Sequence, residues 1–219
     1  MPDPLVVRAV LFDMDGTLVD STAVVEAVWA GFADRFGLDL ATVLGTAHGR
    51  PTRDTVERYA PAGTDVDAVT DALTVLEIAT TRRIVAVPGA ARLLASLPAA
   101  VVGMVTSAPA GLARVRMAAA GLEIPGVVVT ADDIRRGKPD PEGYRLALAR
   151  LGARAEDAVA FEDAPAGIAA ATAAGIQTVV VGDLAADTAG GRMAIHDLTA
   201  VRAVVVDTPT GIWIEIGPE

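Results

Sequence analysis

The sequence predicts an α/β protein with a parallel sheet core and an inserted all-helical cap. The first observation is that short apolar runs alternate with amphipathic stretches, and this alternation indicates a parallel sheet covered by helices. The second is that residues 21–86 break the alternation and carry helical patterns only. The third is size, because 219 residues, 52% of them hydrophobic, are enough to bury a substantial core.

The first predicted strand, Val6–Phe12, ends in the sequence Asp13-Met14-Asp15-Gly16-Thr17. Burying an ionised carboxylate costs several kcal/mol unless it is paired or bound to metal. Ligands of parallel sheets bind at the carboxyl ends of the strands, so Asp13 and Asp15 are placed for chemistry. The alternative is an ordinary Asp-Gly turn after a strand.

Helices are expected over Ala23–Phe36, Thr52–Tyr59 and Val66–Arg83, with a loop at Gly45–Pro51. No strand is expected between Ser21 and about Ala86. Because this interval follows the acidic strand end directly, we interpret residues 21–86 as a cap domain over the strand ends, and residues 1–20 with 87–219 as the catalytic core. The alternative is that these helices simply cover one face of the sheet.

The remaining segments alternate between the two kinds of element. Further strands are predicted over Ala100–Val105, Val127–Thr130, Ala158–Phe161, Thr178–Val181 and Ala203–Val206. Helices are predicted over Ala90–Leu97, Ala110–Ala120, Pro141–Leu151 and Ala164–Ala174. Gly121, Gly152 and Gly175 follow helical runs, as glycines do at helix C-termini. Val204–Asp207 and Gly211–Ile216, joined across Pro209, predict a terminal hairpin.

Composition restricts the partners. The net charge of −10 argues against nucleic acid or an anionic membrane as a partner, so a phosphate site must carry its own positive charge. The chain has no cysteine, which excludes disulfides, thiol nucleophiles and thiolate metal sites. We see neither a signal peptide nor a transmembrane run. We therefore expect a soluble cytoplasmic protein, and we take it to be a monomer.

Polar residues follow three more predicted strands: Thr106-Ser107, Gly137-Lys138-Pro139 and Glu162-Asp163. Lys138 is the only lysine among 18 basic residues. Lysine is a compact point charge with three rotatable donors, unlike arginine, so its retention here favours a functional role over an accidental surface lysine.

This set of groups suits phosphoryl transfer. Two carboxylates and a backbone carbonyl suit Mg²⁺, a hard cation that prefers oxygen ligands. A lysine and a threonine hydroxyl can hold phosphate oxygens. One carboxylate can attack phosphorus to form an aspartyl-phosphate, and a second can protonate the leaving oxygen and then activate water.

The four motifs, Asp-x-Asp-Gly-Thr, the strand-end threonine, Gly-Lys-Pro-Asp-Pro and Glu-Asp-Ala-x-x-Gly, resemble those of the haloacid dehalogenase-like superfamily in order and spacing over essentially the whole chain. The resemblance implies a Rossmann-like core and a small helical cap of the first type. The sequences around Thr130–Asp133 and His48–Thr52 are similar to those of sugar and polyol phosphatases within the superfamily, such as glycerol-phosphate and 2-deoxyglucose-6-phosphate phosphatases.

The resemblance implies a role for each core residue. Asp13 would be the nucleophile and Asp15 the general acid/base. Thr106 would bind the transferring phosphoryl group with help from the Ser107 N–H, and Lys138 would bridge that group and Asp13. The presence of Asp15 argues against the dehalogenases, which lack an acid there, and Met14 is inconsistent with P-type ATPases.

The resemblance also implies a Mg²⁺ site. The ligands would be the Asp13 carboxylate, the Asp15 carbonyl and Asp163, with Glu162 either a ligand or placed behind the ligands. The implied function is a Mg²⁺-dependent phosphatase of a small sugar or polyol phosphate. The alternatives are a hexose-phosphate mutase similar to β-phosphoglucomutase, a phosphoglycolate phosphatase, and a non-catalytic phosphate-binding protein on the same fold.

The cap loop carries the weaker candidates. His48, Arg50 and Arg53 are expected either to contact substrate or to form a solvated charged loop. In the mutases this loop has an arginine, and the alignment brings Arg50 or Thr52 to that place depending on a one-residue choice, which disfavours a mutase. Four further expectations concern other side chains. Arg114, Arg116, Arg135 and Arg136 should face solvent, Trp29 and Phe32 should form cap core, Trp213 should pack in the hairpin, and His196-Asp197 should be an ordinary turn.

Overall fold

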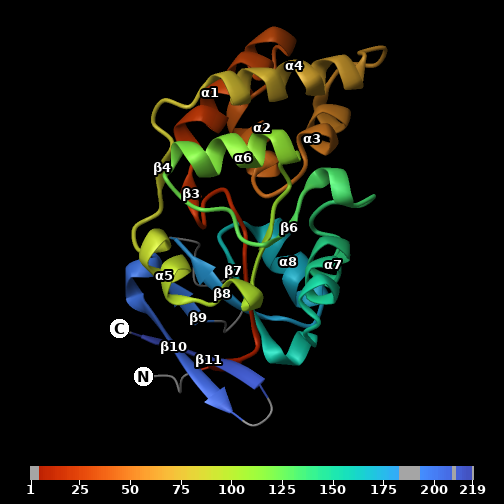
Figure 1. Ribbon diagram of the computed structural model, residues 1–219. Helices are drawn as coiled ribbons and strands as arrows, with labels where there is room; N and C mark the ends of the chain where they lie inside the picture. Colours follow the sequence, from red (N-terminus) through yellow and green to blue (C-terminus); the bar gives the residue numbers. More distant parts are fainter. Residues whose placement is uncertain (1–4, 183–192, 209–210, 219) are drawn as a thin grey trace.

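The computed structural model describes residues 5–182, 193–208 and 211–218 and confirms the α/β fold class (Figure 1). Its core is a six-stranded parallel sheet in the order β6-β5-β2-β7-β8-β9. The strands are β2 (Ala9–Phe12), β5 (Val102–Val105), β6 (Val127–Val129), β7 (Ala158–Glu162), β8 (Gln177–Val181) and β9 (Met193–Ile195). The sequence analysis did not predict β9.

Helices cover both faces of this sheet because alternate strand residues point to opposite sides. Val10 and Phe12 belong to the apolar cluster that includes α5 (Ala90–Ser96) and α6 (Ala110–Ala119). Ala9 and Leu11 belong to the opposite cluster, which includes α7 (Glu142–Leu151) and α8 (Pro165–Ala173). A sheet buried on both faces explains why its strands read as unbroken apolar runs.

The first apolar run is two strands rather than the one that was predicted. β1 (Leu5–Val7) pairs with β11 (Gly211–Pro218), and β2 joins the parallel sheet. The chain changes sheets at Arg8, whose N–H donates to the Asp157 carbonyl at 2.7 Å. β10 (Val201–Thr208) pairs with β11, which confirms the terminal hairpin. The Trp213 side chain lies outside the described residues.

Four helices form a separate layer above the carboxyl ends of the sheet strands (Figure 1). They are α1 (Thr22–Phe36), α2 (Leu40–Ala47), α3 (Thr52–Tyr59) and α4 (Val66–Ala79). They enclose their own apolar cluster, in which Trp29 and Phe32 are buried edge-to-face at 5.3 Å, as expected. This layer stands where a cap was expected, and the division at residues 20/21 and 86/87 stays a prediction.

Three details of this layer differ from the sequence prediction. The helix α2 was not predicted, and its last residues, Gly45–Ala47, lie where a loop was expected; the Asp39 carboxylate caps the start of this helix by accepting a hydrogen bond from the Thr42 N–H at 2.8 Å. α4 ends at Ala79, short of Arg83. The prediction of no strand before Ala86 is also wrong, because β4 (Val85–Ala86) pairs with β3 (Val19–Asp20). The two connections between the layers therefore run side by side.

Helix ends follow the predicted glycines. Gly121, Gly152 and Gly175 all have positive φ angles, 68°, 63° and 82°, a conformation that glycine adopts without steric cost. Among the described residues, no helix combines the length and the apolar character that crossing a bilayer requires.

Candidate active site

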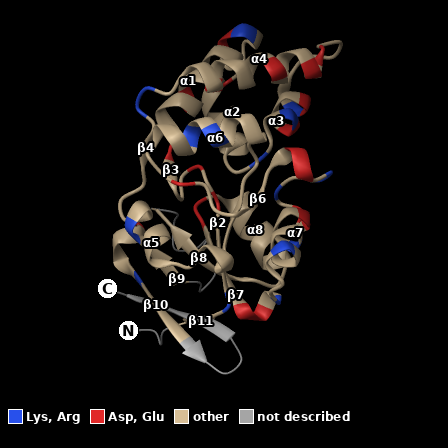
Figure 2. Ribbon diagram, viewed as in Figure 1, with Lys and Arg blue, Asp and Glu red and all other residues tan. Residues whose placement is uncertain are grey.

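The adjacent strands β6, β5, β2 and β7 deliver the predicted residues to one edge of the sheet. Asp13 follows β2 and continues the ladder, since its N–H donates to the Phe161 carbonyl at 3.0 Å. Thr106 follows β5 in the same way, with its N–H on the Val129 carbonyl at 2.9 Å. The acidic loops gather at this edge, beneath α6 (Figure 2).

The turn after Asp13 requires a glycine. Gly16 has a φ angle of 85°, and a Cβ placed on it would lie 2.0 Å from the Asp163 Oδ2 atom. The Leu18 N–H donates to the Met14 carbonyl at 2.8 Å and closes the turn. This turn brings the loop after β2 against the loop after β7, so the Asp-x-Asp-Gly-Thr motif and Asp163 form one unit.

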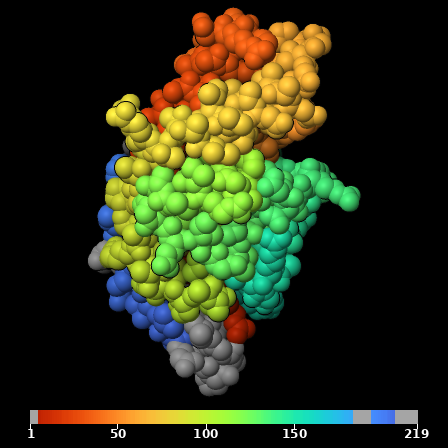
Figure 3. All heavy atoms as spheres, turned by 45° about the horizontal axis from the view of Figure 1, so that its top comes forward, coloured from red at the N-terminus to blue at the C-terminus, as the bar shows by residue number. Residues whose placement is uncertain are grey.

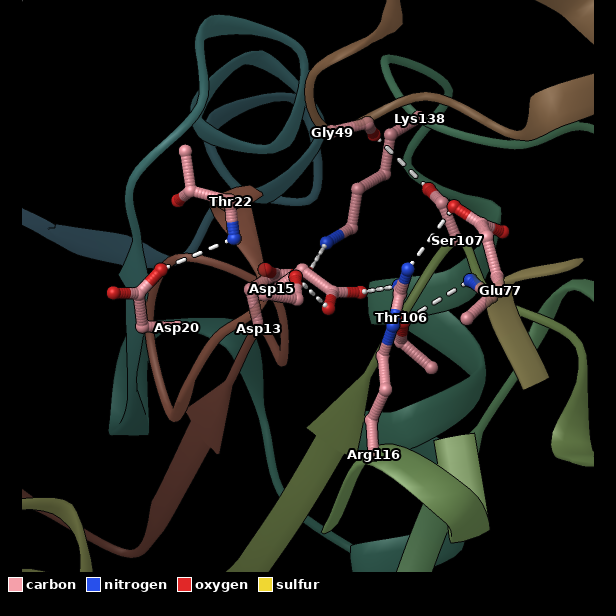
Figure 4. A network of polar contacts seen from close by, with 12 residues as sticks. Asp13, Asp15, Asp20, Thr22, Gly49, Glu77, Thr106, Ser107, Arg116 and Lys138 are labelled. Atoms are coloured by element: carbon pink, nitrogen blue, oxygen red, sulfur yellow. Dashed lines mark hydrogen bonds and ion pairs between the residues drawn. The ribbon is translucent and has the colours of Figure 1, made fainter. Parts of the chain in front are cut away.

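Lys138 is buried at this edge, with 4% of its surface exposed, so it is not a surface lysine. Its Nζ atom contacts the Asp13 Oδ1 atom and lies 2.7 Å from the Glu162 Oε1 atom. The Tyr144 hydroxyl donates to the same Glu162 oxygen at 2.6 Å. Figure 4 shows the lysine reaching toward Asp13. The ammonium therefore joins the β2 and β7 strand ends.

Three of the acids could hold a metal ion. Asp13, Glu162 and Asp163 each offer a carboxylate oxygen, and these oxygens lie within 4.8 Å of one another. The Glu162 Oε2 atom is buried and has no hydrogen-bond partner, as expected of an oxygen that faces a cation or a cation-bound water. An all-oxygen donor set fits Mg²⁺. The Asp15 carboxylate lies outside this cluster, and the resemblance assigned only its backbone carbonyl to the metal.

Electrostatics in the cluster favour a bound cation. Burial, with repulsion from Glu162 and Asp163, raises the pKa of Asp13 well above its usual value although Lys138 opposes this. Burial and the neighbouring Glu162 raise the pKa of Asp163 to about 7. Burial alone would lower the pKa of Lys138, but the adjacent carboxylates outweigh it and raise that pKa. The lysine therefore stays charged, and an added cation would relieve the repulsion among the acids.

A small cavity joins these core residues to the cap. Its volume is about 70 Å³. Its lining includes Asp13, Asp15, Thr106, Ser107, His48, Arg50, Glu77 and Arg116. The Ser107 hydroxyl donates to the Gly49 carbonyl at 3.0 Å, which ties the strand end of β5 to the cap loop. His48 and Arg50 thus lie where a substrate in the cavity would meet the cap.

Arg53 and the His196-Asp197 pair lie elsewhere. Arg53 is exposed and forms ion pairs with Glu57 and Asp67 on the cap, and it does not line the cavity. The Asp197 carboxylate accepts a hydrogen bond from the Thr199 N–H at 2.9 Å, which confirms an ordinary turn. Arg114, Arg135 and Arg136 are exposed, as expected.

The expectation that Arg116 faces solvent is wrong. α6 lies between the sheet and the cap, so its buried side includes Arg116, which is 3% exposed. Its Nη1 atom donates to the Asp15 Oδ2 atom at 2.7 Å and its Nη2 atom to the Glu77 Oε1 atom at 3.0 Å. The helix pattern carried a signal, because Arg116 falls four residues after Leu112, on the apolar stripe of α6. Glu77 likewise follows Leu73 by four residues in α4.

Comparisons with known proteins agree with this geometry. The family model for haloacid dehalogenase-like hydrolases matches residues 7–175. Hexitol phosphatase A of Escherichia coli strain K12 is 38% identical over 178 residues, which cover 80% of this chain and 82% of that protein. Validoxylamine A 7'-phosphate phosphatase of Streptomyces hygroscopicus subsp. limoneus is 36% identical over 220 residues, 96% of this chain and 99% of that protein.

A solved structure extends the comparison to the fold. A protein from Bacteroides vulgatus, provisionally assigned as a β-phosphoglucomutase, superposes with a TM-score of 0.73 and 29% identity. The match covers 88% of this chain and 84% of that one. The resemblance drawn from the four motifs is therefore confirmed, and the chain belongs to the haloacid dehalogenase-like hydrolases.

Proposed function

We propose that this protein is a Mg²⁺-dependent phosphatase that hydrolyses a small sugar or polyol phosphate monoester through an aspartyl-phosphate on Asp13. One observation carries the proposal. Asp13, a buried ammonium and an oxygen-only acidic cluster lie together at one strand edge. The names of the curated relatives, which include hexitol phosphatase A, support the substrate class.

The first half of the reaction transfers the phosphoryl group to the protein. An Asp13 carboxylate oxygen attacks phosphorus, a new P–O bond forms, and the P–O bond to the substrate alcohol breaks. Asp15 donates a proton to the leaving oxygen. Lys138 and the Thr106 hydroxyl hold the other phosphoryl oxygens. Bound Mg²⁺ would supply positive charge against the phosphoryl oxygens, held by Asp13, the Asp15 carbonyl and Asp163, with Glu162 adjoining.

The second half returns the protein to its starting state. Water attacks phosphorus, Asp15 takes a proton from that water, and the bond between phosphorus and the Asp13 oxygen breaks. Inorganic phosphate leaves, and Asp13 is again a carboxylate. The cap closes over this chemistry and limits the entry of bulk water.

The cavity size supports a small substrate. A volume of about 70 Å³ is several times the roughly 10–15 Å³ that one water molecule needs, so the cavity has room for a group of a few heavy atoms, such as a phosphoryl group. The substrate alcohol would then extend toward the cap residues of the lining, among them His48 and Arg50. We therefore propose that the cap residues recognise the alcohol part of the substrate and that the core residues recognise its phosphate group.

A panel of phosphate esters tests the proposal. The panel contains a hexitol phosphate, glycerol phosphate, 2-deoxyglucose 6-phosphate, phosphoglycolate and β-glucose 1-phosphate. Released phosphate is measured with Mg²⁺, with excess chelator, and for Asp13→Asn, whose neutral amide is a poor nucleophile. With Mg²⁺ we expect phosphate release by the wild-type protein and by the control variant, and we expect none in excess chelator and none by Asp13→Asn. The control is Asp71→Asn, the same chemical change at an exposed position of α4.

Two results would contradict the proposal. Full activity in chelator would remove the metal from the mechanism, and near wild-type activity of Asp13→Asn would remove the covalent intermediate. Isomerisation of β-glucose 1-phosphate without phosphate release would favour the mutase alternative.

A further inference from the structure

Asp15, Arg116 and Glu77 form a chain of ion pairs across the boundary between core and cap. Asp15 belongs to the catalytic loop, Arg116 to the core helix α6 and Glu77 to the cap helix α4. The guanidinium donates to both carboxylates, at 2.7 and 3.0 Å. Figure 4 shows it between the two acids, and the space-filling view shows α4 directly against α6 (Figure 3).

Two of the three residues in this chain of ion pairs are buried, while the Asp15 side chain is 28% exposed. Arg116 is 3% exposed and Glu77 is 5% exposed. A buried ion pair contributes little net stability compared with apolar packing of the same volume, because both charges lose their hydration. An arginine in this position therefore calls for a reason other than stability. Both residues also line the cavity that contains Asp13.

The Asp15 carboxylate is held from two sides. Its Oδ2 atom accepts from Arg116, and its Oδ1 atom accepts from the Ser21 hydroxyl at 2.6 Å. Ser21 is the N-cap residue of α1, and Glu77 lies near the end of α4. The cap thus reaches Asp15 through its first and its last helix, and the two hydrogen bonds together restrict the rotation of the carboxylate.

We propose that Arg116 is a positioning residue that holds the Asp15 carboxylate for proton transfer, and that Glu77 keeps Arg116 in place while the cap is closed. This inference rests on the proposed function. It applies to the half-reaction in which water attacks phosphorus, the phosphorus–Asp13 bond breaks and Asp15 accepts the proton of that water. A general base must lie within hydrogen-bond reach of the proton that it takes, so a freely rotating carboxylate would slow this step.

One substrate isolates that step. 4-Nitrophenyl phosphate has a weakly basic leaving group, which departs without a proton, so formation of the aspartyl-phosphate does not need Asp15. The rate of nitrophenolate release in the first turnover, and kcat/KM, report that formation. The steady-state kcat includes hydrolysis of the intermediate.

For Arg116→Gln with Mg²⁺ we expect kcat to fall by about tenfold or more. A general base typically contributes roughly 10²-fold or more to the rate, and losing the residue that positions it should remove part of that contribution. The first-turnover rate and kcat/KM should stay within about threefold of wild type, so KM falls with kcat. Arg116→Lys, which keeps a cation beside Asp15, should recover part of kcat. Glu77→Gln should show the same pattern with a smaller loss.

The matched control is Arg154→Gln. Arg154 also bonds to two carboxylates, Glu156 and Asp157, but it is 69% exposed and precedes β7, at the opposite edge of the sheet from the site. Its kinetics should not change.

Two results would overturn the inference. The first is an equal fall of the first-turnover rate and kcat in Arg116→Gln, which indicates a general fold or binding defect. The second is no change in either rate. Thermal unfolding shows whether Arg116→Gln folds. If it does not fold, the first-turnover rate and kcat of Arg116→Lys and Glu77→Gln test the inference in its place. Absence of Mg²⁺-dependent nitrophenolate release by wild type would instead overturn the proposed function, and this inference with it.

Discussion

Replacing Lys138 with arginine should remove most activity although the positive charge is kept. The ammonium occupies a closed space between the Asp13 and Glu162 carboxylates, and the Tyr144 ring centroid lies 5.5 Å from its Nζ atom. The opposite side of Glu162 is closed as well, since a Cβ on Gly167 would lie 1.9 Å from its Oε1 atom. The larger planar guanidinium cannot take the place of a compact point charge here.

The size of the effect follows from two separate losses. One preorganised charge contact to the transferring phosphoryl group is worth about 3 kcal/mol, or on the order of a hundredfold in kcat. Forcing extra atoms into a packed site costs about 1–3 kcal/mol of folding stability. We therefore expect Lys138→Arg to lose about two orders of magnitude in kcat while it remains folded and slightly less stable.

The assay compares kcat for a preferred ester with the midpoint of thermal unfolding. Arg136→Lys is the matched control, because it makes the reverse exchange in the same loop at a side chain that is 72% exposed. It should change neither quantity. A Lys138→Arg protein with wild-type kcat would refute the assignment of Lys138 to the phosphoryl group.

Four further predictions concern the metal site and the cap. Gly167→Ala should lower the folding stability by about 1–3 kcal/mol and should also lower kcat, because the added Cβ would meet the Glu162 carboxylate. The control is Gly31→Ala, in a helix where no atom lies within 4 Å of the added Cβ. In thermal unfolding this control should be neutral or stabilising. Calorimetric titration should show Mg²⁺ affinity rising with pH up to about 7, where Asp163 loses its proton, and an affinity independent of pH would contradict that assignment. The same raised pKa means that the metal-free folded state holds this proton more tightly than the unfolded state, so its stability should fall as pH rises from about 4 to about 7. Arg50→Ala should raise KM for sugar and polyol phosphates and reorder their preference while sparing a minimal aryl phosphate; an equal loss on all esters would implicate Arg50 in folding or phosphate binding.

The core fold and the side chains gathered at the candidate site could be predicted because both depend on local patterns. Apolar runs alternating with amphipathic stretches indicate a parallel sheet, and parallel strands present their carboxyl ends at one edge. Asp13, Thr106 and Lys138 could therefore be placed near one another without coordinates. The layer of helices α1–α4 could be anticipated because most of residues 21–86 lack the strand pattern of the core.

Other features depend on which element lies beside which. β9 is short, so its own sequence does not indicate a strand. It becomes a strand because it pairs with β8. The helix α2 was not predicted either, although Asp39 stands at its N-cap position, where aspartate is a signal for a helix start.

Arg116 shows most clearly which features depend on the packing of distant segments. From the sequence alone, a charged residue on a helix is expected to face solvent. That expectation fails where a second layer covers the helix, and here α4 covers α6 and brings Glu77 to the guanidinium. Which chemical groups the candidate site contains can be read from the sequence, because each group follows its own strand. The packing of cap on core decided how Asp15 is held, because Arg116 and Glu77 are 39 residues apart in the chain and meet only in the folded protein.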